Sequence, residues 1–208
     1  MVLSYKTLKT QAESQITEKK SRFIATAAPV PTQDEAWLFI ERIKKKYKDA
    51  AHNCAAYRVG ADALFERRSD DGEPSGTAGA PILETLRKAN VTDAVVVVTR
   101  YFGGILLGAA SLSRVYAASA AGGLRAAGVV EKRLMQNMSV TVDYGLSGKL
   151  GGEIVNRAFL LKDTVYGENV TFYVAHAPDS AALAEDFYTR VSAGKAVIKR
   201  LSIEYIVI

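Results

Sequence analysis

Residues 91–102 constrain the fold of this chain more than any other segment. Residues 95–98 are four consecutive valines, so an extended strand here has apolar side chains on both of its faces. Such a strand needs protein cover on both sides, which it finds in the middle of a sheet. We therefore predict a covered sheet with this segment as an inner strand.

Two glycine-rich segments flank this strand in the sequence. Residues 69–79 read SDDGEPSGTAG, and residues 100–108 read RYFGGILLG. Each lies before a predicted helix. Glycine permits positive φ and close approach of another group to the backbone. We expect any function to lie on the surface that these two segments form.

Length, charge and cysteine content narrow the class of protein. The 208 residues suffice for one or two domains, and no segment approaches the roughly 18 apolar residues of a membrane span. Residues 1–6 lack the charged-then-apolar order of a signal peptide. The single cysteine, Cys54, excludes an internal disulfide and favours a cytoplasmic location. The net charge of +5 permits an anionic partner without requiring one.

The first two thirds of the chain predict strands and helices in mixed order. Residues 5–30 indicate two strands. Thr32 and Glu35 form a capping box that begins a helix. A strand follows at 53–59, and residues 77–89 suit a helix with Thr77 as its N-cap. Another helix, at 109–127, is predicted to end at Gly128.

The remaining residues predict a second domain. Their elements follow the order strand, helix, strand, strand, helix, strand, which is the ferredoxin-like pattern. The expected ranges are 134–143, 145–157, 159–166, 170–176, 179–192 and 196–207. We predict an α+β protein with domains at residues 1–133 and 134–208.

The second glycine-rich segment resembles a nucleotide loop only in part. The spacing of Gly103 and Gly108 fits a Walker A loop, but Ala109 and Ala110 stand where Lys and Ser or Thr are needed. This excludes nucleotide hydrolysis by that route. A helix N-terminus that suits an anion remains. A turn that lets strand and helix pack closely is the favoured interpretation.

The acidic part of the first segment, with Asp70, Asp71 and Glu73, lacks the ligand spacing of a calcium loop. Capping of helix amides or pairing with nearby arginines, including Arg100, is favoured over a cation site. Residues 76–79 suit either an anion-binding nest or capping by Thr77, and capping is favoured.

His52 and Cys54 alternate on a predicted strand and so share one face. We favour a packed pair over half of a zinc site. Arg100 with Tyr101, and Arg114 with Tyr116, suit either contact with phosphate and a base or simple packing of the tyrosine. We predict no cofactor, no metal and no assigned catalytic residue.

Taken together, these motifs resemble the YigZ/IMPACT family over the whole chain, in its bacterial two-domain layout. The matching parts are residues 19–24, the pair His52 and Cys54, residues 69–79, residues 96–108, Arg114 and Tyr116. One departure is that Ala110 and Ser111 replace family glycines, which makes close backbone approach by a ligand less secure there.

The resemblance implies a fold and a cellular context. It implies an N-terminal domain like domain two of a small-subunit ribosomal protein, and a ferredoxin-like C-terminal domain similar to those of elongation factor G. Eukaryotic members regulate translation initiation by competing for an activator of a stress kinase. Bacteria lack that kinase pathway, so only a link to RNA or ribosomes is carried over. The family supplies no established catalytic residues.

The leading hypothesis is a cytoplasmic, non-catalytic regulatory protein of translation that binds RNA or the ribosome. The alternatives are a small-molecule or phosphate-binding enzyme, such as a hydrolase, that uses the acidic and glycine-rich loops, and a protein-interaction adaptor. The predicted contact residues are Lys20, Arg22, Asp70, Asp71, Glu73, Gly76, Thr77, Gly79, Arg100, Tyr101, Gly103, Gly104 and Arg114.

Overall fold

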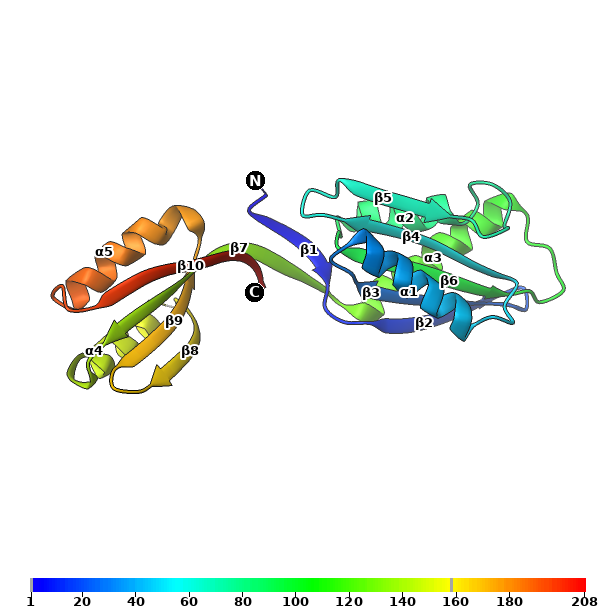
Figure 1. Cartoon of the computed structure of the whole chain (residues 1–208). Coiled ribbons are helices and arrows are strands. Elements are labelled where there is room, and N and C mark those ends of the chain that lie inside the picture. The colour runs from blue at the N-terminus through cyan, green and yellow to red at the C-terminus, as the bar shows by residue number, and fades with distance from the viewer. Residues whose placement is uncertain (1, 158) are drawn as a thin grey trace. The chain divides into compact units, whose positions relative to one another are not determined.

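The chain folds into two compact units, Met1–Lys132 and Arg133–Ile208, called here the N-terminal and C-terminal units. The structure is a computed structural model that describes residues 2–157 and 159–208. Each unit combines helices with an antiparallel sheet, so the protein is α+β as predicted (Figure 1).

The N-terminal unit is built on a five-stranded sheet with the predicted inner strand at its centre. The strand order is β2-β3-β6-β4-β5. These strands are β2 (Ala12–Glu18), β3 (Ser21–Pro29), β6 (Ala94–Tyr101), β4 (His52–Val59) and β5 (Phe65–Ser69). All four valines of residues 95–98 are fully buried. The inner position of the strand is thus confirmed, although the strand covers Ala94–Tyr101 rather than all of residues 91–102.

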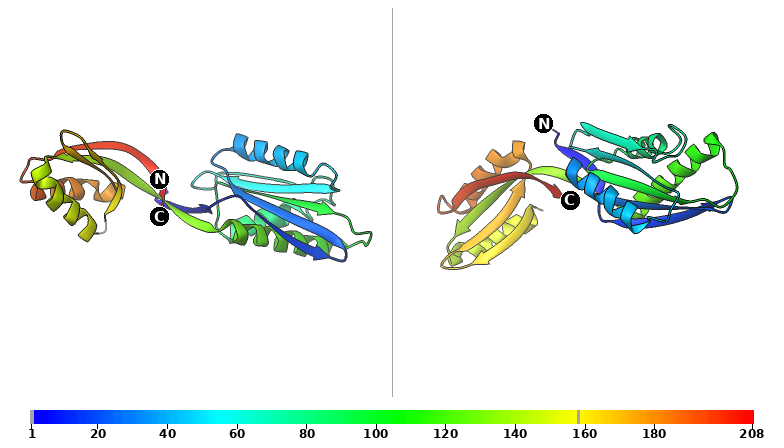
Figure 2. Two further views of the ribbon diagram at one scale, coloured as in Figure 1. Left: turned by 90° about the horizontal axis from the view of Figure 1, so that it is seen from below. Right: turned by 45° about the vertical axis from the view of Figure 1, so that its right-hand side comes forward.

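Helices cover both faces of this sheet (Figure 2). Helix α1 (Gln33–Lys46) packs on the face that carries Val95 and Val97. Helices α2 (Gly79–Lys88) and α3 (Ala109–Ala127) pack on the opposite face, with Val96 and Val98. The alternation of side chains along β6 thus supplies two hydrophobic layers from one strand.

Two predicted helix ends are confirmed. The Thr32 hydroxyl accepts a hydrogen bond from the backbone N–H of Glu35 at 3.2 Å, at the start of α1. Gly128, with φ of +71°, ends α3 and donates its N–H to the carbonyl of Leu124 at 3.0 Å.

The prediction of two strands in residues 5–30 is wrong, because β1 (Ser4–Leu8) is a third strand. Strand β1 ends at Leu8, and the next two residues, Lys9 and Thr10, donate their backbone N–H groups to the carbonyls of Gly128 and Ala127. No glycine or proline marks the end of this strand. Hydrogen bonds to a segment more than a hundred residues away set it, and the local sequence does not reveal such bonds.

The C-terminal unit follows the predicted order of elements. It contains all but the first four residues of β7 (Val129–Val142). The elements that follow are α4 (Tyr144–Asn156), β8 (Leu160–Tyr166), β9 (Val170–His176), a 3-10 turn (Pro178–Ser180), α5 (Ala181–Val191) and β10 (Val197–Val207). Its strands are ordered β8-β9-β7-β10. Met138 and Val140 of β7 pack against Ile154 and Tyr188 in the core. No helix in residues 2–157 and 159–208 has the length and apolar character that crossing a membrane requires.

Candidate functional site

The loop between β5 and α2 is organised around the carboxylate of Asp70. Its Oδ1 accepts the backbone N–H groups of Ala78 (3.0 Å) and Gly79 (2.8 Å), and its Oδ2 accepts that of Gly76 (2.8 Å). Burial opposes ionisation of Asp70, but these three amides hold its pKa below the usual range. The amides of Gly76, Ala78 and Gly79 thus surround an anion, as in the less favoured interpretation of residues 76–79, and that anion is the protein's own carboxylate.

Thr77 does not cap α2, contrary to the prediction. Its hydroxyl donates to the carbonyl of Pro74 at 2.7 Å, and the helix begins two residues later, at Gly79. A Cβ on Gly79 would lie 2.9 Å from the backbone of Ser69, so only glycine lets the loop return this closely. The carboxylate of Asp70, at the other end of the loop, takes the place of a capping side chain next to the helix. Capping motifs in the sequence do not predict a partner this far away.

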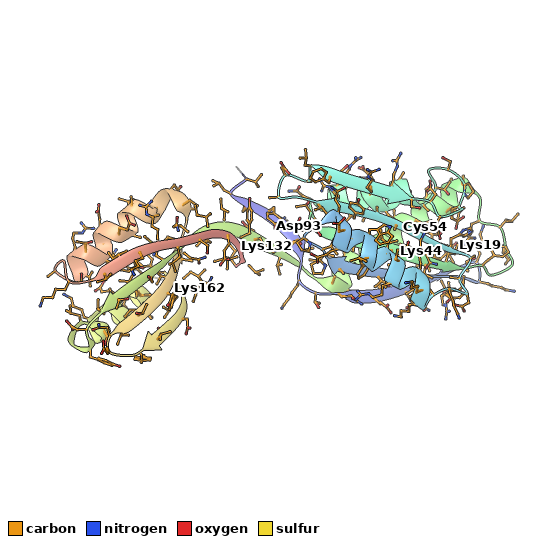
Figure 3. All side chains as sticks on the ribbon, in the orientation of Figure 1. Lys19, Lys44, Cys54, Asp93, Lys132 and Lys162 are labelled. Carbon is orange, nitrogen blue, oxygen red and sulfur yellow. The ribbon has the colours of Figure 1, made fainter. Side chains whose placement is uncertain are left out.

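Asp71 connects the same loop to α1 and β4. Its Oδ1 accepts a hydrogen bond from Lys44 Nζ at 2.8 Å, and its Oδ2 accepts the backbone N–H of Asn53 at 2.7 Å. Burial raises the pKa of Asp71, but these donors outweigh it and the pKa is lowered. Figure 3 labels Lys44, which comes from α1. The predicted partners of the acidic residues, helix amides or nearby arginines, are wrong for Asp71, which takes a lysine of α1 and a backbone amide of β4 instead.

His52 and Cys54 both hold this loop by its backbone. His52 Nδ1–H donates to the carbonyl of Asp71 at 2.8 Å, and the Cys54 thiol donates to the carbonyl of Asp70 at 2.9 Å. Burial raises the pKa of Cys54 to about 12, so this side chain stays a thiol and a poor nucleophile near neutral pH. The predicted packed pair on one face of β4 is confirmed.

Glu73 joins the loop to the central strand and to α3. Its side chain is 2% exposed. Its Oε1 accepts hydrogen bonds from Arg100 Nη1 on β6 at 2.6 Å and from the Tyr116 hydroxyl on α3 at 2.7 Å. Burial raises the pKa of Tyr116, which keeps its hydroxyl a donor. His52 Nε2 lies 4.0 Å from Glu73 Oε2. Three elements, β4, β6 and α3, thus meet at the one buried carboxylate of the loop.

The second glycine-rich segment approaches the start of β3 closely. A Cβ on Gly103 would lie 2.1 Å from the carbonyl carbon of Lys20, and the Gly103 N–H donates to Ser21 Oγ at 3.1 Å. Gly104 and Gly108 adopt φ of +80° and +76°. The interpretation as a close-packing turn is confirmed, except that the neighbour is the β2–β3 turn rather than a helix.

The predicted contact residues do not form one surface. Arg100 lies on the α2–α3 side of the sheet, whereas Tyr101 lies on the α1 side, where its hydroxyl donates to Asp49 at 2.9 Å. The Arg22 guanidinium stacks at 4.4 Å from the centre of the Tyr101 ring. Successive side chains of a strand point to opposite faces of the sheet, so Arg100 and Tyr101 are separated. Their adjacent positions in the sequence already implied this.

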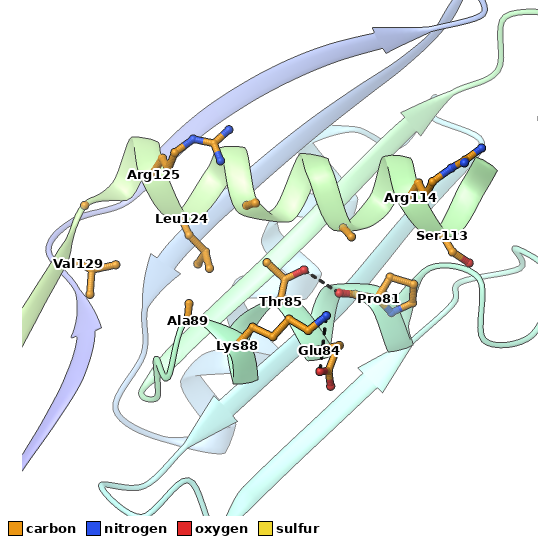
Figure 4. A pocket seen from close by; sticks show the side chains of 13 residues that line it. Pro81, Glu84, Thr85, Lys88, Ala89, Ser113, Arg114, Leu124, Arg125 and Val129 are labelled. Carbon is orange, nitrogen blue, oxygen red and sulfur yellow. Dashed lines mark hydrogen bonds and ion pairs between the residues drawn. The ribbon is translucent and has the colours of Figure 1, made fainter. Parts of the chain in front are cut away.

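A groove between α2 and α3 was not anticipated (Figure 4). Its volume is about 920 Å³. Lys88, Arg114 and Arg125 line it, and Glu84 is the one acidic side chain among the described residues of its lining. Its apolar lining comes from Pro81, Ala89, Ala117, Ala121, Leu124 and Val129. We call it the α2–α3 groove. Of the predicted contact residues, only Arg114 lines it.

Comparison with known proteins places the chain in a family. Residues 19–124 match the sequence profile of the Impact N-terminal domain. The chain is also 43% identical over 206 residues to "IMPACT family member YvyE" of Bacillus subtilis, covering 99% of this chain and 95% of that protein. The chain belongs to the IMPACT family. "IMPACT family member YigZ" of Escherichia coli is 36% identical over 155 residues, which cover 69% of this chain and 76% of that protein.

Other relatives of this IMPACT family member match it over a shorter length or at lower identity. "Protein IMPACT" of Mus musculus is 37% identical over 98 residues, covering 45% of this chain and 30% of that protein. A solved structure titled "Crystal structure of an hypothetical protein" superimposes with a TM-score of 0.64 at 28% identity, covering 98% of this chain and all of that chain. The likeness to the solved structure thus extends over both units.

Removing the Asp70 carboxylate is expected to weaken α2. Asp70→Ala leaves three amides at the helix start without their acceptor, so we expect the free energy of unfolding to fall by about 1–2 kcal/mol. Urea titration measures this, with Ser75→Ala, an exposed change in the same loop, as control. Because the pKa of Asp70 is lowered in the folded protein, the difference in free energy of unfolding between wild type and variant should vanish as the pH falls through that pKa. A difference that stays constant down to acidic pH would contradict this role.

Proposed function

We propose that this IMPACT family member is a cytoplasmic, translation-associated protein that binds RNA, free or within the ribosome, through its N-terminal unit. The observation that carries the proposal is the set of three cations along the α2–α3 groove. Arg114 and Arg125 form no ion pair within the described residues, and Lys88 reaches Glu84 only at 4.0 Å. Cations that lack strong internal partners are available to phosphate.

The distribution of charge supports the same unit. Residues 1–132 hold 19 Lys and Arg against 14 Asp and Glu, so the whole net charge of +5 lies in the N-terminal unit. Residues 133–208 hold eight of each sign. An excess of positive charge on one unit attracts a polyanion and raises its rate of association.

Fold analogy adds a weaker argument. The strand order β8-β9-β7-β10 fits a ferredoxin-like unit such as those of elongation factor G, and the N-terminal unit is proposed to be like domain two of a small-subunit ribosomal protein. Similar folds serve unrelated functions, so this analogy supports an association with translation but not a particular mechanism of binding.

Salt dependence tests the proposal. Labelled fragments of ribosomal RNA and purified ribosomes are titrated with the full chain at several salt concentrations. Because each phosphate contact releases bound counterions, we expect Arg114→Ala with Arg125→Ala to lower the slope of log affinity against log salt by about 1.5. Lys45→Ala with Lys48→Ala removes the same charge from exposed positions near the end of α1, on the other face of the sheet, and should change the slope less. Equal effects from the two pairs, or no binding near 100 mM salt, would contradict the proposal.

The apolar lining of the groove favours a second candidate, an adaptor that docks a segment of another protein. Ala117, Ala121 and Leu124 offer the apolar contact that an amphipathic helix needs. Such binding depends weakly on salt and survives nuclease treatment of a lysate. These two properties separate the adaptor from the RNA-binding protein.

A further inference from the structure

A small cavity of the C-terminal unit lies beside His176, the last residue of β9. Its volume is about 240 Å³. Besides His176, its polar lining comes from Arg157 at the end of α4 and from Ser180 and Arg190 at the two ends of α5. We call it the His176 pocket. It shares no residue with the α2–α3 groove, so a ligand bound there is independent of RNA binding in that groove.

The buried hydroxyl of Tyr188 fixes one ring nitrogen of His176. Nε2 of His176 lies 2.8 Å from this hydroxyl. Tyr188 is fully buried, and burial raises its pKa, so the hydroxyl keeps its proton. His176 Nε2 is the one acceptor for that proton among residues 2–157 and 159–208. Buried donors nearly always have an acceptor, so the hydroxyl donates to Nε2.

The other ring nitrogen of His176 is therefore a free donor. Burial lowers the pKa of His176, so the ring is neutral near pH 7 and carries a single N–H. Because Nε2 accepts from Tyr188, this N–H is on Nδ1. Nδ1 has no hydrogen-bond partner in the described part of the chain, and it is not one of the fully buried polar atoms. Its N–H is thus open to the pocket that His176 lines.

Two arginines add positive charge to the same pocket. The Arg157 guanidinium lies 4.4 Å from the centre of the Phe187 ring, and its Nε lies 3.5 Å from a carboxylate oxygen of Glu153. Arg190, in the last turn of α5, forms no ion pair within the described residues. The described lining of the pocket includes no acidic side chain. These donors bind an oxyanion better than any neutral acceptor.

Aromatic rings lie between His176 and Arg157. The ring of Phe159 is 4.7 Å from that of His176 and 5.4 Å from that of Phe187, and both contacts are edge-to-face. A volume of about 240 Å³ is below that of most pockets for drug-sized ligands, so the ligand is small. We propose that the His176 pocket binds a small organic anion, a carboxylate or phosphate monoester with an apolar body, which accepts the Nδ1–H of His176 and lies beside Arg157 and Arg190.

The tautomer of His176 gives the first test. Long-range ¹H–¹⁵N spectra of the full ¹⁵N-labelled chain near pH 7 show which ring nitrogen carries the proton. We expect the proton of His176 on Nδ1. A proton on Nε2 would overturn the proposal, because Nδ1 would then be an acceptor and would repel an anion.

Titration with two probes gives the second test. Benzoate and phenyl phosphate are added separately to the labelled chain, and the ring signals of His176 are followed. We expect them to shift saturably, and the probe that binds more tightly identifies the oxyanion, carboxylate or phosphate monoester. His52, the other histidine of the chain, lies in the N-terminal unit and should not respond. No saturable shift of the His176 signals at millimolar concentrations would overturn the proposal.

A matched pair of variants tests the position of the anion. Arg190→Gln removes a charge from the pocket at an exposed position of α5, and we expect about tenfold weaker binding of the better probe. Lys199→Gln removes the same charge from β10. Its neighbour Arg200 reaches Glu185 of α5, so Lys199 points to the other face of the sheet and its loss should leave binding unchanged. Equal effects of the two variants would overturn the site, and acetate that binds as tightly as benzoate would overturn the role of the aromatic rings.

Discussion

Glu73→Ala is expected to lower the free energy of unfolding of the N-terminal unit by about 3–5 kcal/mol. The substitution leaves the Arg100 guanidinium buried without its counter-charge, and it removes the acceptor of the Tyr116 hydroxyl. An uncompensated buried charge is the most costly result of breaking an ion pair, because desolvation of the charge is no longer offset. Urea unfolding followed by the fluorescence of Trp37, the single tryptophan, measures this in the N-terminal unit.

Two further variants separate the buried charge from simple loss of packing. Glu84→Ala on exposed α2 breaks only contacts of 3.9 and 4.0 Å and should cost less than about 0.5 kcal/mol. Glu73→Leu combined with Arg100→Met removes both charges and should be more stable than Glu73→Ala, although it changes more atoms. A double variant less stable than the single one would show that packing, not the unpaired charge, dominates.

Gly103→Ala is expected to destabilise the N-terminal unit by about 3 kcal/mol, the upper end of the usual cost of overpacking. The new methyl group would lie 2.1 Å from the carbonyl carbon of Lys20 and 2.4 Å from the backbone nitrogen of Ser21. Both neighbours are backbone atoms, so no side-chain rotation relieves the clash. The β2–β3 turn must move away from the loop after β6, which also breaks the hydrogen bond from Gly103 to Ser21.

Gly104→Ala is the matched control, one residue further on. Its φ is +80°, but a Cβ there meets nothing within 4 Å, so the substitution introduces backbone strain without a clash. We expect a loss of about 1–2 kcal/mol from the left-handed conformation alone. The same Trp37 fluorescence assay compares the two variants. Equal losses would show that conformation, and not close approach, explains the glycine at position 103.

The buried network and the α2–α3 groove share helix α3. Tyr116 fixes this helix to Glu73 near its middle, and Arg114 of the same helix lines the groove. The Glu73 variants are therefore expected to disturb the groove through the position of α3.

Local sequence was sufficient wherever a few neighbouring residues set the outcome. The run of valines at residues 95–98 placed β6 inside its sheet, because such a run is stable only when covered on both faces. Thr32 with Glu35, and Gly128, located helix ends, because a cap is made by residues within one turn. The element order after residue 129 followed in the same way.

Tertiary structure alone decided which partners the charged residues of the motifs took. Glu73 meets Arg100 and Tyr116, 27 and 43 residues further along the chain, and Asp70, rather than Thr77, caps α2. The groove between α2 and α3 likewise exists only once these two helices pack. A motif fixes which groups are available. Their choice of partner depends on distances and burial that long-range packing creates.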